Sequence, residues 1–373
     1  MSTRRLKVIL RGGHTYDIRI GHRLITNLGI HLRATSKATK ASKALVISDD
    51  HVGPLYLAAV KAGLEKADFE VFDVSIPPGE DSKSLAVAAE LFGALALFGI
   101  GGDDVLVALG GGVVCDIAGF VAANYLCGIE YVQVPTSFLA MVDSPVGGKT
   151  AVNLEGRRNL VGSLKQPTYV AVDLAVLSSL PDEEWENGLA EIARFALIDG
   201  EEFTEWLTTN AEGLMAHDEA AVQQALVEAL SFKARCVTHL EKSEGRIECL
   251  DYGNVFAHAL EAVAGQGIVS HGRIVAEGMR FAARLAVEAI GAPEGFVVVQ
   301  DALLNSLGLA PILQAYSADA LFDALLSEKA RGCEGSELRI IFTEAPGKWQ
   351  SVGVDPDLVK IYLILWEQAR MEP

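Results

Sequence analysis

The sequence predicts two structural parts: an α/β domain with a Rossmann-like, doubly wound and mostly parallel sheet over residues 1–177, and an all-α domain over residues 178–373. Short β-rich runs alternate with helix-like runs in the first half, and long helical periods fill the second half. With 373 residues, half of them hydrophobic, the chain is too long for one core. We therefore expect two domains, each with its own hydrophobic core.

The first half supplies the strands. One strand starts the chain in MSTRRLKVIL, and further β-rich runs cover residues 43–50, 69–76, 104–112 and 129–135. Helix-like runs separate them at residues 55–67, 84–100 and 114–126. Because these strands are apolar on both faces, they fit a parallel sheet that is covered by helices on both sides.

The second half supplies the helices. Long amphipathic periods cover residues 183–198, 219–242, 256–265 and 272–291, and the main strand-like run is at residues 338–344. The stretch SSLPDEEW marks the boundary, because Ser and Pro precede acidic residues that favour the start of a helix.

The composition excludes several classes of protein. The formal net charge of -18 repels nucleic acid and anionic lipid, although a local cluster of cations can still bind an anionic metabolite. Five cysteines without a C-x-x-C pair form no disulfide framework, which fits a reducing cytoplasm. The most apolar region, residues 91–129, is interrupted by GIGGDD, GGG and Asp116, so no membrane-spanning stretch is expected. The apolar run in MSTRRLKVIL is too short for a signal peptide. We expect a soluble, cytoplasmic protein.

The strongest local motif is VLVALGGGVVCDIAGF, a strand that runs into three glycines and then into a helix. Glycines such as Gly111 and Gly112 let a diphosphate approach the backbone, and the helix N-terminus offers free N–H groups. A simple tight turn is the alternative. Asp49 follows the strand KALVI, where its carboxylate could hold a ribose hydroxyl or cap a helix. Glu80 and Lys83 lie on a loop that enters a helix, where ligands collect, although a Pro-Gly turn with a helix cap is the alternative.

The segment of residues 134–162 has too many polar residues and glycines to be an idle connection, so we expect a functional loop. The segment offers hydroxyls, a carboxylate, cations and an amide. This set suits a polyhydroxylated, anionic small molecule, because its many oxygens need hydrogen-bond donors and acceptors at fixed places. A solvated surface loop is the alternative. The residues concerned are Thr136, Ser137, Asp143, Lys149, Arg157, Arg158 and Asn159.

The helical half contains a second polar group. Glu191 and Arg194 have i, i+3 spacing, for which a surface ion pair is the default interpretation. Asn254 and His258 lie one helical turn apart, and His271 opens another helix. Two histidines and a glutamate on neighbouring helices can converge on a divalent metal, although buried histidines often only satisfy backbone carbonyls.

Taken in order, GGGVVCDIAGF, VPTSFLAMVDSPVGGKTAVN, RRNLVG, GLAEIARFALI, SFKARCV, DYGNVFAHALE and SHGRIVAEGM resemble the 3-dehydroquinate synthases and related sugar phosphate cyclases. The resemblance implies an NAD-dependent homodimer that converts the seven-carbon sugar phosphate DAHP into 3-dehydroquinate, a step of the shikimate pathway. It implies oxidation of an alcohol by NAD, β-elimination of phosphate, reduction of the ketone and an aldol closure. It also implies an active site in the cleft between the two domains, with a zinc or cobalt ion there.

The resemblance also implies roles for individual residues. NAD would be held by Asp49, Glu80, Lys83, Gly111, Gly112, Asp116, Thr136 and Ser137. The substrate and its chemistry would involve Asp143, Lys149, Asn159, Arg194, Lys233, Asp251 and His258, with Lys149 and Lys233 countering negative charge and His258 relaying a proton. The metal ligands would be Glu191, His271 and Asn254.

The sequence departs from the family pattern inside this site. Asn254 stands in place of a histidine ligand, Arg194 in place of Lys, Asp251 in place of Asn, and Cys127 in place of Arg. An amide is a poorer zinc ligand than imidazole, and a thiol cannot replace a guanidinium at phosphate, so we expect weakened metal binding and altered phosphate recognition. His258 could instead ligate the metal from the next helical turn. Arg246 stands one residue out of register with a family arginine, so its role stays open. Lys329 and Arg331 could bind the phosphate or form a basic cluster that the dipole favours at a helix end.

These departures leave other functions open. One is a sister cyclase that acts on another sugar phosphate, such as sedoheptulose 7-phosphate or glucose 6-phosphate, and another is a non-catalytic paralogue that retains NAD. The glycerol dehydrogenase group shares the two-domain plan, but VGGKT and RRNLVG fit it less well.

Overall fold

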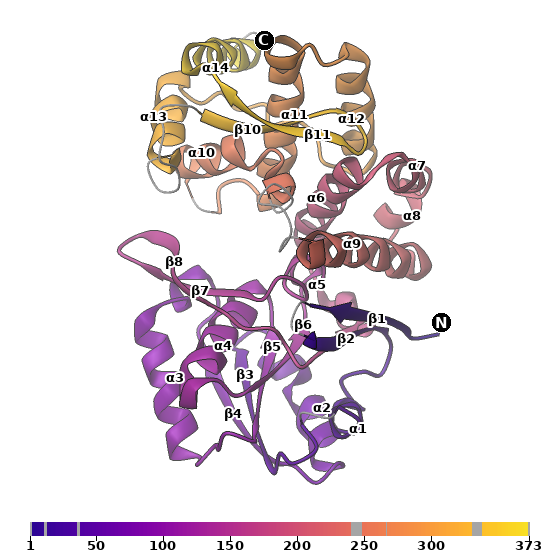
Figure 1. Cartoon of the computed structure of the whole chain (residues 1–373), viewed down its shortest axis with the longest axis vertical. Helices are drawn as coiled ribbons and strands as arrows, with labels where there is room; N and C mark the ends of the chain where they lie inside the picture. Colours follow the sequence, from indigo (N-terminus) through magenta and orange to yellow (C-terminus); the bar gives the residue numbers. More distant parts are fainter. Residues whose placement is uncertain are drawn as a thin grey trace. The chain divides into compact units, whose positions relative to one another are not determined.

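The computed structural model describes residues 2–10, 13–35, 38–239, 248–265, 267–329 and 338–371. The chain forms two compact units, residues 1–180 and residues 181–373 (Figure 1). The division falls inside the stretch SSLPDEEW. No helix in the described ranges is both long and apolar enough to cross a membrane.

The N-terminal unit is an α/β domain. Its strands are β1 (Arg4–Ile9), β2 (Thr15–Gly21), β3 (Lys43–Asp49), β4 (Glu70–Ile76), β5 (Val105–Gly110), β6 (Glu130–Pro135), β7 (Lys149–Leu154), β8 (Arg157–Leu164) and β9 (Tyr169–Asp173). Its α-helices are α1 (Leu28–Arg33), α2 (Gly53–Glu65), α3 (Leu85–Leu97), α4 (Gly112–Asn124) and α5 (Phe138–Asp143). Residues 80–82, 125–127 and 174–179 form short 3₁₀ turns.

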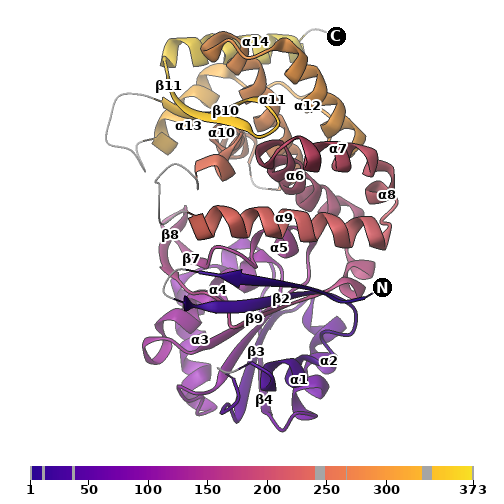
Figure 2. The same ribbon diagram turned by 45° about the vertical axis from the view of Figure 1, so that its right-hand side comes forward.

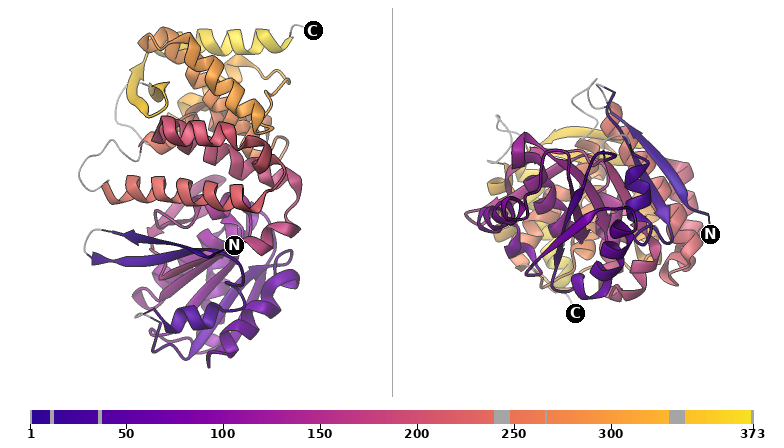
Figure 3. Two further views of the ribbon diagram at one scale, coloured as in Figure 1. Left: turned by 90° about the vertical axis from the view of Figure 1, so that its right-hand side faces the viewer. Right: turned by 90° about the horizontal axis from the view of Figure 1, so that it is seen from below.

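Seven of these strands form one sheet in the order β1-β2-β9-β6-β5-β3-β4. Every neighbouring pair from β2 to β4 is parallel. Only β1, which lies at the edge of the sheet, pairs antiparallel, and its partner is β2 (Figure 3). The predicted mostly parallel sheet is therefore confirmed. Strands β2 and β9 were not predicted, because neither is flanked by a long helical run in the sequence.

Helices cover both faces of this sheet. Figure 2 shows α1 and α2 on one side of the strands and α3 on the other. All six residues of β5 are buried, as a central strand between two helical layers requires. One core cluster packs α3 and α4 against β3 and β5, through residues that include Leu45, Leu91, Leu106 and Ile117. This packing is the doubly wound arrangement that the apolar strands predict.

The winding of the sheet reverses beside β3. From β3 the chain moves outward to β4, and β5 then pairs with the opposite edge of β3. In open α/β sheets, ligands bind at the carboxyl ends of the strands that flank such a reversal. The Oγ of Ser48, near the end of β3, donates to the carbonyl oxygen of Leu109 in β5 across this point (2.8 Å). The fold therefore directs attention to the residues that follow β3 and β5.

The C-terminal unit is largely helical. Its helices are α6 (Asp182–Asp199), α7 (Glu201–Thr209), α8 (Ala211–Met215), α9 (Glu219–His239), α10 (Asn254–Ala264), α11 (His271–Ile290), α12 (Glu294–Ser306), α13 (Ala318–Lys329) and α14 (Pro356–Met371). A 3₁₀ turn covers residues 248–251. The predicted helical character is confirmed, but the unit is not purely helical, because β10 (Leu338–Ala345) and β11 (Lys348–Val354) form an antiparallel hairpin that starts in the strand-like run LRIIFTE.

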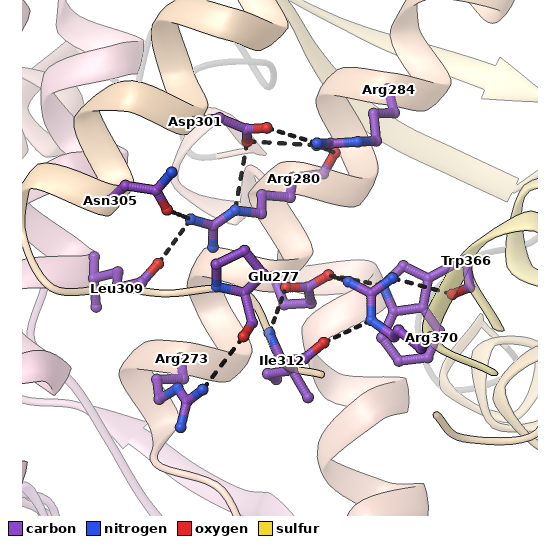
Figure 4. A network of polar contacts seen from close by, with 11 residues as sticks. Arg273, Glu277, Arg280, Arg284, Asp301, Asn305, Leu309, Ile312, Trp366 and Arg370 are labelled. Atoms are coloured by element: carbon purple, nitrogen blue, oxygen red, sulfur yellow. Dashed lines mark hydrogen bonds and ion pairs between the residues drawn. The ribbon is translucent and has the colours of Figure 1, made fainter. Parts of the chain in front are cut away.

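A buried polar network holds the helices of this unit together (Figure 4). Glu277 of α11 is 1% exposed and accepts hydrogen bonds from Trp366 Nε1 (2.7 Å), from the Ile312 backbone N–H (3.2 Å) and from Arg370. One helical turn along α11, Arg280 donates to the side chain of Asn305 (2.8 Å). The Glu277 carboxylate on α11 therefore holds the C-terminal helix α14 in place.

Candidate functional site

The glycine motif forms an open turn between β5 and α4. Gly111 precedes the first residue of α4, Gly112, and no side chain caps this helix end. A Cβ at Gly112 would meet no atom of the described residues within 4 Å, so the backbone is uncovered there. Ser137 lies beside the turn, since a Cβ at Gly111 would be 3.6 Å from the Ser137 Oγ. The turn can therefore present free N–H groups to an anion.

The residues that follow β3 and β6 lie at the same edge of the sheet as this turn. The Thr136 backbone N–H donates to the Gly110 carbonyl oxygen (3.0 Å), which holds the two strand ends together. Asp49 Oδ1 accepts hydrogen bonds from the backbone N–H groups of His51 (2.9 Å) and Val52 (2.8 Å). The Asp49 carboxylate thus holds the turn that leads into α2, but it does not cap the helix, whose N-cap residue is Val52.

Lys83 and Asp116 form an ion pair that joins the loop before α3 to α4. Lys83 is 5% exposed, so its ammonium is buried against this carboxylate. Burial raises the pKa of Asp116, and the ammonium of Lys83 opposes that shift. Asp143 lies near enough to raise the pKa of Asp116 further. Three residues predicted from separate motifs therefore share one electrostatic environment.

Asn153 links two parts of this site, and it was not predicted as a site residue. Its Nδ2 donates to Glu80 Oε1 (2.8 Å), and its Oδ1 accepts from the backbone N–H of Asn159 (2.9 Å). Its own backbone N–H donates to the Lys83 carbonyl oxygen (2.7 Å). The only sequence signal was its place in the motif VGGKTAVN. Asn153 ties the β7–β8 hairpin to the loop that carries Glu80 and Lys83.

Replacing Asn153 with alanine is expected to loosen the β7–β8 hairpin. The Asn159 N–H would lose its acceptor, a loss of about 1 kcal/mol. Hydrogen exchange of a peptide from residues 155–164 should speed up by roughly fivefold to tenfold. An Asn210→Ala variant is the control, because the Asn210 side chain donates to the Trp206 carbonyl oxygen in the C-terminal unit, and it should leave exchange of this peptide unchanged. Unchanged exchange in Asn153→Ala would contradict the proposed link.

Most of the segment of residues 134–162 is regular secondary structure, which corrects the expectation that it is a loop. It contains α5 and most of the β7–β8 hairpin. Asp143 at the end of α5, Lys149 at the start of β7, and Asn159 in β8 are all exposed. Asn159 adopts a positive φ of 55°. These side chains lie on the surface of the N-terminal unit, which is where residues that receive a ligand are expected.

Cys127 lies far from the glycine turn of its own unit. It belongs to the 3₁₀ turn that follows the far end of α4, and α4 spans about 20 Å. An arginine at this position could not reach Gly111 or Gly112. The cysteine therefore has no effect on an anion held at that turn.

In the C-terminal unit, three helices bring four of the predicted residues together. Arg194 of α6 forms an ion pair with Glu191 and donates to Asn254 Oδ1 of α10 (2.5 Å). His271 Nε2, at the start of α11, lies 3.5 Å from Glu191 Oε1. The prediction that Glu191 and His271 meet is confirmed. The prediction that this ion pair lies on the surface is wrong, because Glu191 and Arg194 are buried, with exposed fractions of only 7% and 3%.

Close approaches of the backbone explain how these helices converge. A Cβ at Gly272 would lie 2.2 Å from the Glu186 carbonyl oxygen, and the Gly272 N–H donates to Asn187 Oδ1 (2.7 Å). The start of α11 is thereby fixed against α6. Gly253, with φ of 80°, lies against α11, since a Cβ at Gly278 would be 2.2 Å from the Gly253 carbonyl oxygen. Only glycines allow α10 to begin so close to α11.

The remaining predicted residues of this unit have different surroundings. Asp251 accepts a hydrogen bond from Asn254 Nδ2 (3.1 Å), so it joins the group. Lys233 is buried on α9, with its ammonium 5.9 Å from the centre of the Phe195 ring. His258 is exposed, and within the described residues no three His, Cys, Asp or Glu side chains are grouped to hold a metal. His258 does not complete a metal site with Glu191 and His271.

Three further basic candidates fall where the structure gives no side-chain information. Arg246 and Arg331 lie outside the described residues, and the side chain of Lys329 is not described. Their predicted contact with phosphate stays a prediction.

Known proteins match nearly the whole chain. Residues 73–187 match the 3-dehydroquinate synthase N-terminal family and residues 188–331 match the 3-dehydroquinate synthase C-terminal family. The 3-dehydroquinate synthase of Caulobacter vibrioides is 37% identical over 364 residues, which cover 95% of this chain and 96% of the relative.

Solved structures show the same fold. A 2-deoxy-scyllo-inosose synthase, solved with carbaglucose-6-phosphate, NAD⁺ and Co²⁺, has a TM-score of 0.87 at 24% identity and covers 96% of this chain and 99% of its own. The 2-epi-5-epi-valiolone synthase of Streptomyces hygroscopicus, with NAD⁺ and Zn²⁺ bound, has a TM-score of 0.82 at 24% identity and covers 97% of this chain and 99% of its own. The family matches and the sequence identity to its curated members lead to one conclusion: this chain belongs to the 3-dehydroquinate synthase family.

Proposed function

We propose that the protein is a 3-dehydroquinate synthase, a lyase that cyclises DAHP to 3-dehydroquinate with elimination of phosphate and with NAD as its cofactor. The observation that carries the proposal is that the residues of the family motifs form two polar groups, one in each unit. The first is the Lys83–Asp116 pair of the N-terminal unit, and the second joins Glu191, Arg194, Asn254 and His271 in the C-terminal unit. Relatives with this name are 36% to 40% identical over most of the chain. We also expect a cytoplasmic homodimer, as the resemblance implies.

The N-terminal unit fits NAD. The glycine turn is uncovered at Gly112, it follows a strand at the reversal of the sheet, and the N–H groups of the first turn of α4 are available to a diphosphate. Asp49 stands at the neighbouring strand end. When bound, NAD supplies the removal and the return of a hydride at one ring alcohol.

The chain's own residues provide the binding and the proton chemistry. Lys149 is an exposed cation that can pair with the phosphate or carboxylate of the substrate. Asn159 offers an amide on the same hairpin. In the C-terminal unit, Arg194 and Lys233 supply buried positive charge for oxygens that become negative, and the exposed His258 offers an imidazole for proton transfer.

The C-terminal residues do not fit a divalent metal ion as they stand. Related cyclases bind Co²⁺ or Zn²⁺, and the corresponding ligands here would be Glu191, His271 and Asn254. Two of these three side chains already accept hydrogen bonds from the guanidinium of Arg194. One of these two acceptors, Asn254, moreover offers only a neutral amide oxygen.

Release of inorganic phosphate tests the proposed function. The purified chain with NAD is expected to release phosphate from DAHP at least tenfold faster than from sedoheptulose 7-phosphate or glucose 6-phosphate. The assay is run with and without added zinc or cobalt, and bound NAD is measured on the same sample. Release from another sugar phosphate alone would identify a sister cyclase. Retained NAD without release from any of the three would identify a non-catalytic paralogue.

A further inference from the structure

The guanidinium of Arg194 gathers acceptors from three separate elements. It pairs with Glu191 one turn earlier on α6, it donates to Asn254 Oδ1 on α10 (2.5 Å), and it donates to the Leu250 carbonyl oxygen in the 3₁₀ turn (2.9 Å). Glu191 and Arg194 are both buried. A planar guanidinium with several donors is suited to such a convergent set, and it stays charged at every pH that a protein experiences.

A divalent ion would need the same oxygen atoms. His271 Nε2 lies 3.5 Å from Glu191 Oε1, and Arg194 donates to that same oxygen. An ion bound between Glu191, His271 and residue 254 would therefore stand next to a fixed, buried positive charge. Two cations that share one carboxylate in a site with little water repel each other strongly. Binding of the ion would require Arg194 to leave its buried position.

The side chain of Asn254 is oriented for a guanidinium. Its Nδ2 donates to Asp251 Oδ1 (3.1 Å), and its Oδ1 accepts from Arg194. Both hydrogen bonds require the same orientation of the amide, so its oxygen faces the guanidinium. Two departures from the family pattern, Arg for Lys at position 194 and Asn for His at position 254, are thus in direct contact.

We propose that Arg194 takes the place of a tightly bound divalent ion in this protein, and that Asn254 is the acceptor that accommodates it. The two substitutions act as a pair: the longer guanidinium reaches position 254, where an amide oxygen accepts from it. Consequently zinc and cobalt bind weakly to the wild-type chain. The inference does not depend on which sugar phosphate is converted, because metal binding is measured without substrate.

Metal titration of the full chain tests this. The wild-type protein, Asn254→His, Arg194→Lys and the double variant are freed of metal by dialysis and titrated with zinc by calorimetry and with cobalt by its visible absorption. Each single variant should bind zinc up to about tenfold more tightly than the wild type. The double variant should bind about 1,000-fold more tightly, because only it frees Glu191 and also supplies a second imidazole.

Arg280→Lys is the matched control. Arg280 lies on α11 in the same unit, is 3% exposed, and donates to an asparagine oxygen, that of Asn305 (2.8 Å), beside the carboxylate of Asp301. The Arg280→Lys variant should therefore bind zinc with the affinity of the wild type. A zinc gain in this control equal to that of the double variant would overturn the proposal. So would a wild-type chain that still holds one zinc ion per chain by elemental analysis after the same dialysis, a result that needs no variant to fold.

Discussion

Replacing Glu277 with alanine is expected to lower the free energy of unfolding of the C-terminal unit by about 4 kcal/mol, within the range of 3–5 kcal/mol for breaking a buried ion pair. The Glu277 carboxylate is 1% exposed and holds the guanidinium of Arg370 and the indole N–H of Trp366 on α14 (Figure 4). Without it, the indole N–H, the Ile312 N–H and one nitrogen of the Arg370 guanidinium would lose their acceptor, while Arg370 would keep its bonds to the carbonyl oxygens of Ile312 and Trp366. Urea unfolding followed by tryptophan fluorescence measures the loss.

Two further variants separate the charge of Glu277 from its size. Glu277→Gln retains the shape and one acceptor oxygen, so its loss should be about half that of the alanine variant. Glu288→Ala, at an exposed position on the same helix α11, should change the free energy of unfolding by no more than about 0.5 kcal/mol. A Glu277→Ala chain as stable as Glu288→Ala would show that the network contributes nothing to the fold.

Much of the fold follows from local sequence patterns. The apolar runs at residues 43–50 and 104–112 are buried on both faces, and such strands can lie only in the centre of a covered sheet. The glycine turn between β5 and α4 was also predictable, because a strand that meets a helix over glycines is a local signal. The proximity of Glu191 and His271 was predictable only through the family resemblance, since they lie on different helices.

Other features depend on contacts between distant segments and could not be predicted. Arg194 and Glu191 have the spacing of an ordinary surface pair, and nothing local to α6 indicates that α10 and α11 bury them. Asn153 became a link between β7 and the loop at Glu80 only through the tertiary fold. A site residue whose partners are far away in the sequence carries no periodic signal of its own.

Replacing Asp116 with asparagine is expected to destabilise the N-terminal unit by about 3 kcal/mol, because the buried ammonium of Lys83 would lose its carboxylate. The double variant Lys83→Met, Asp116→Leu removes both charges and fills their space with apolar groups. It should recover most of that stability, because a buried pair contributes little net free energy relative to well-packed apolar side chains. Urea unfolding of the separate variants measures both effects.

The double variant also separates stability from cofactor binding. If Lys83 and Asp116 contact NAD, as we propose, the stable double variant should bind NAD at least about tenfold more weakly than the wild type, since hydrogen bonds that involve charged groups contribute about 1.5–3 kcal/mol. Lys61→Met is the control, because the Lys61 pair with Asp73 is partly exposed and should be worth at most about 1 kcal/mol. Wild-type NAD affinity in a folded double variant would leave the Lys83–Asp116 pair a purely structural role, because the nucleotide would then be held by the glycine turn and the strand ends alone.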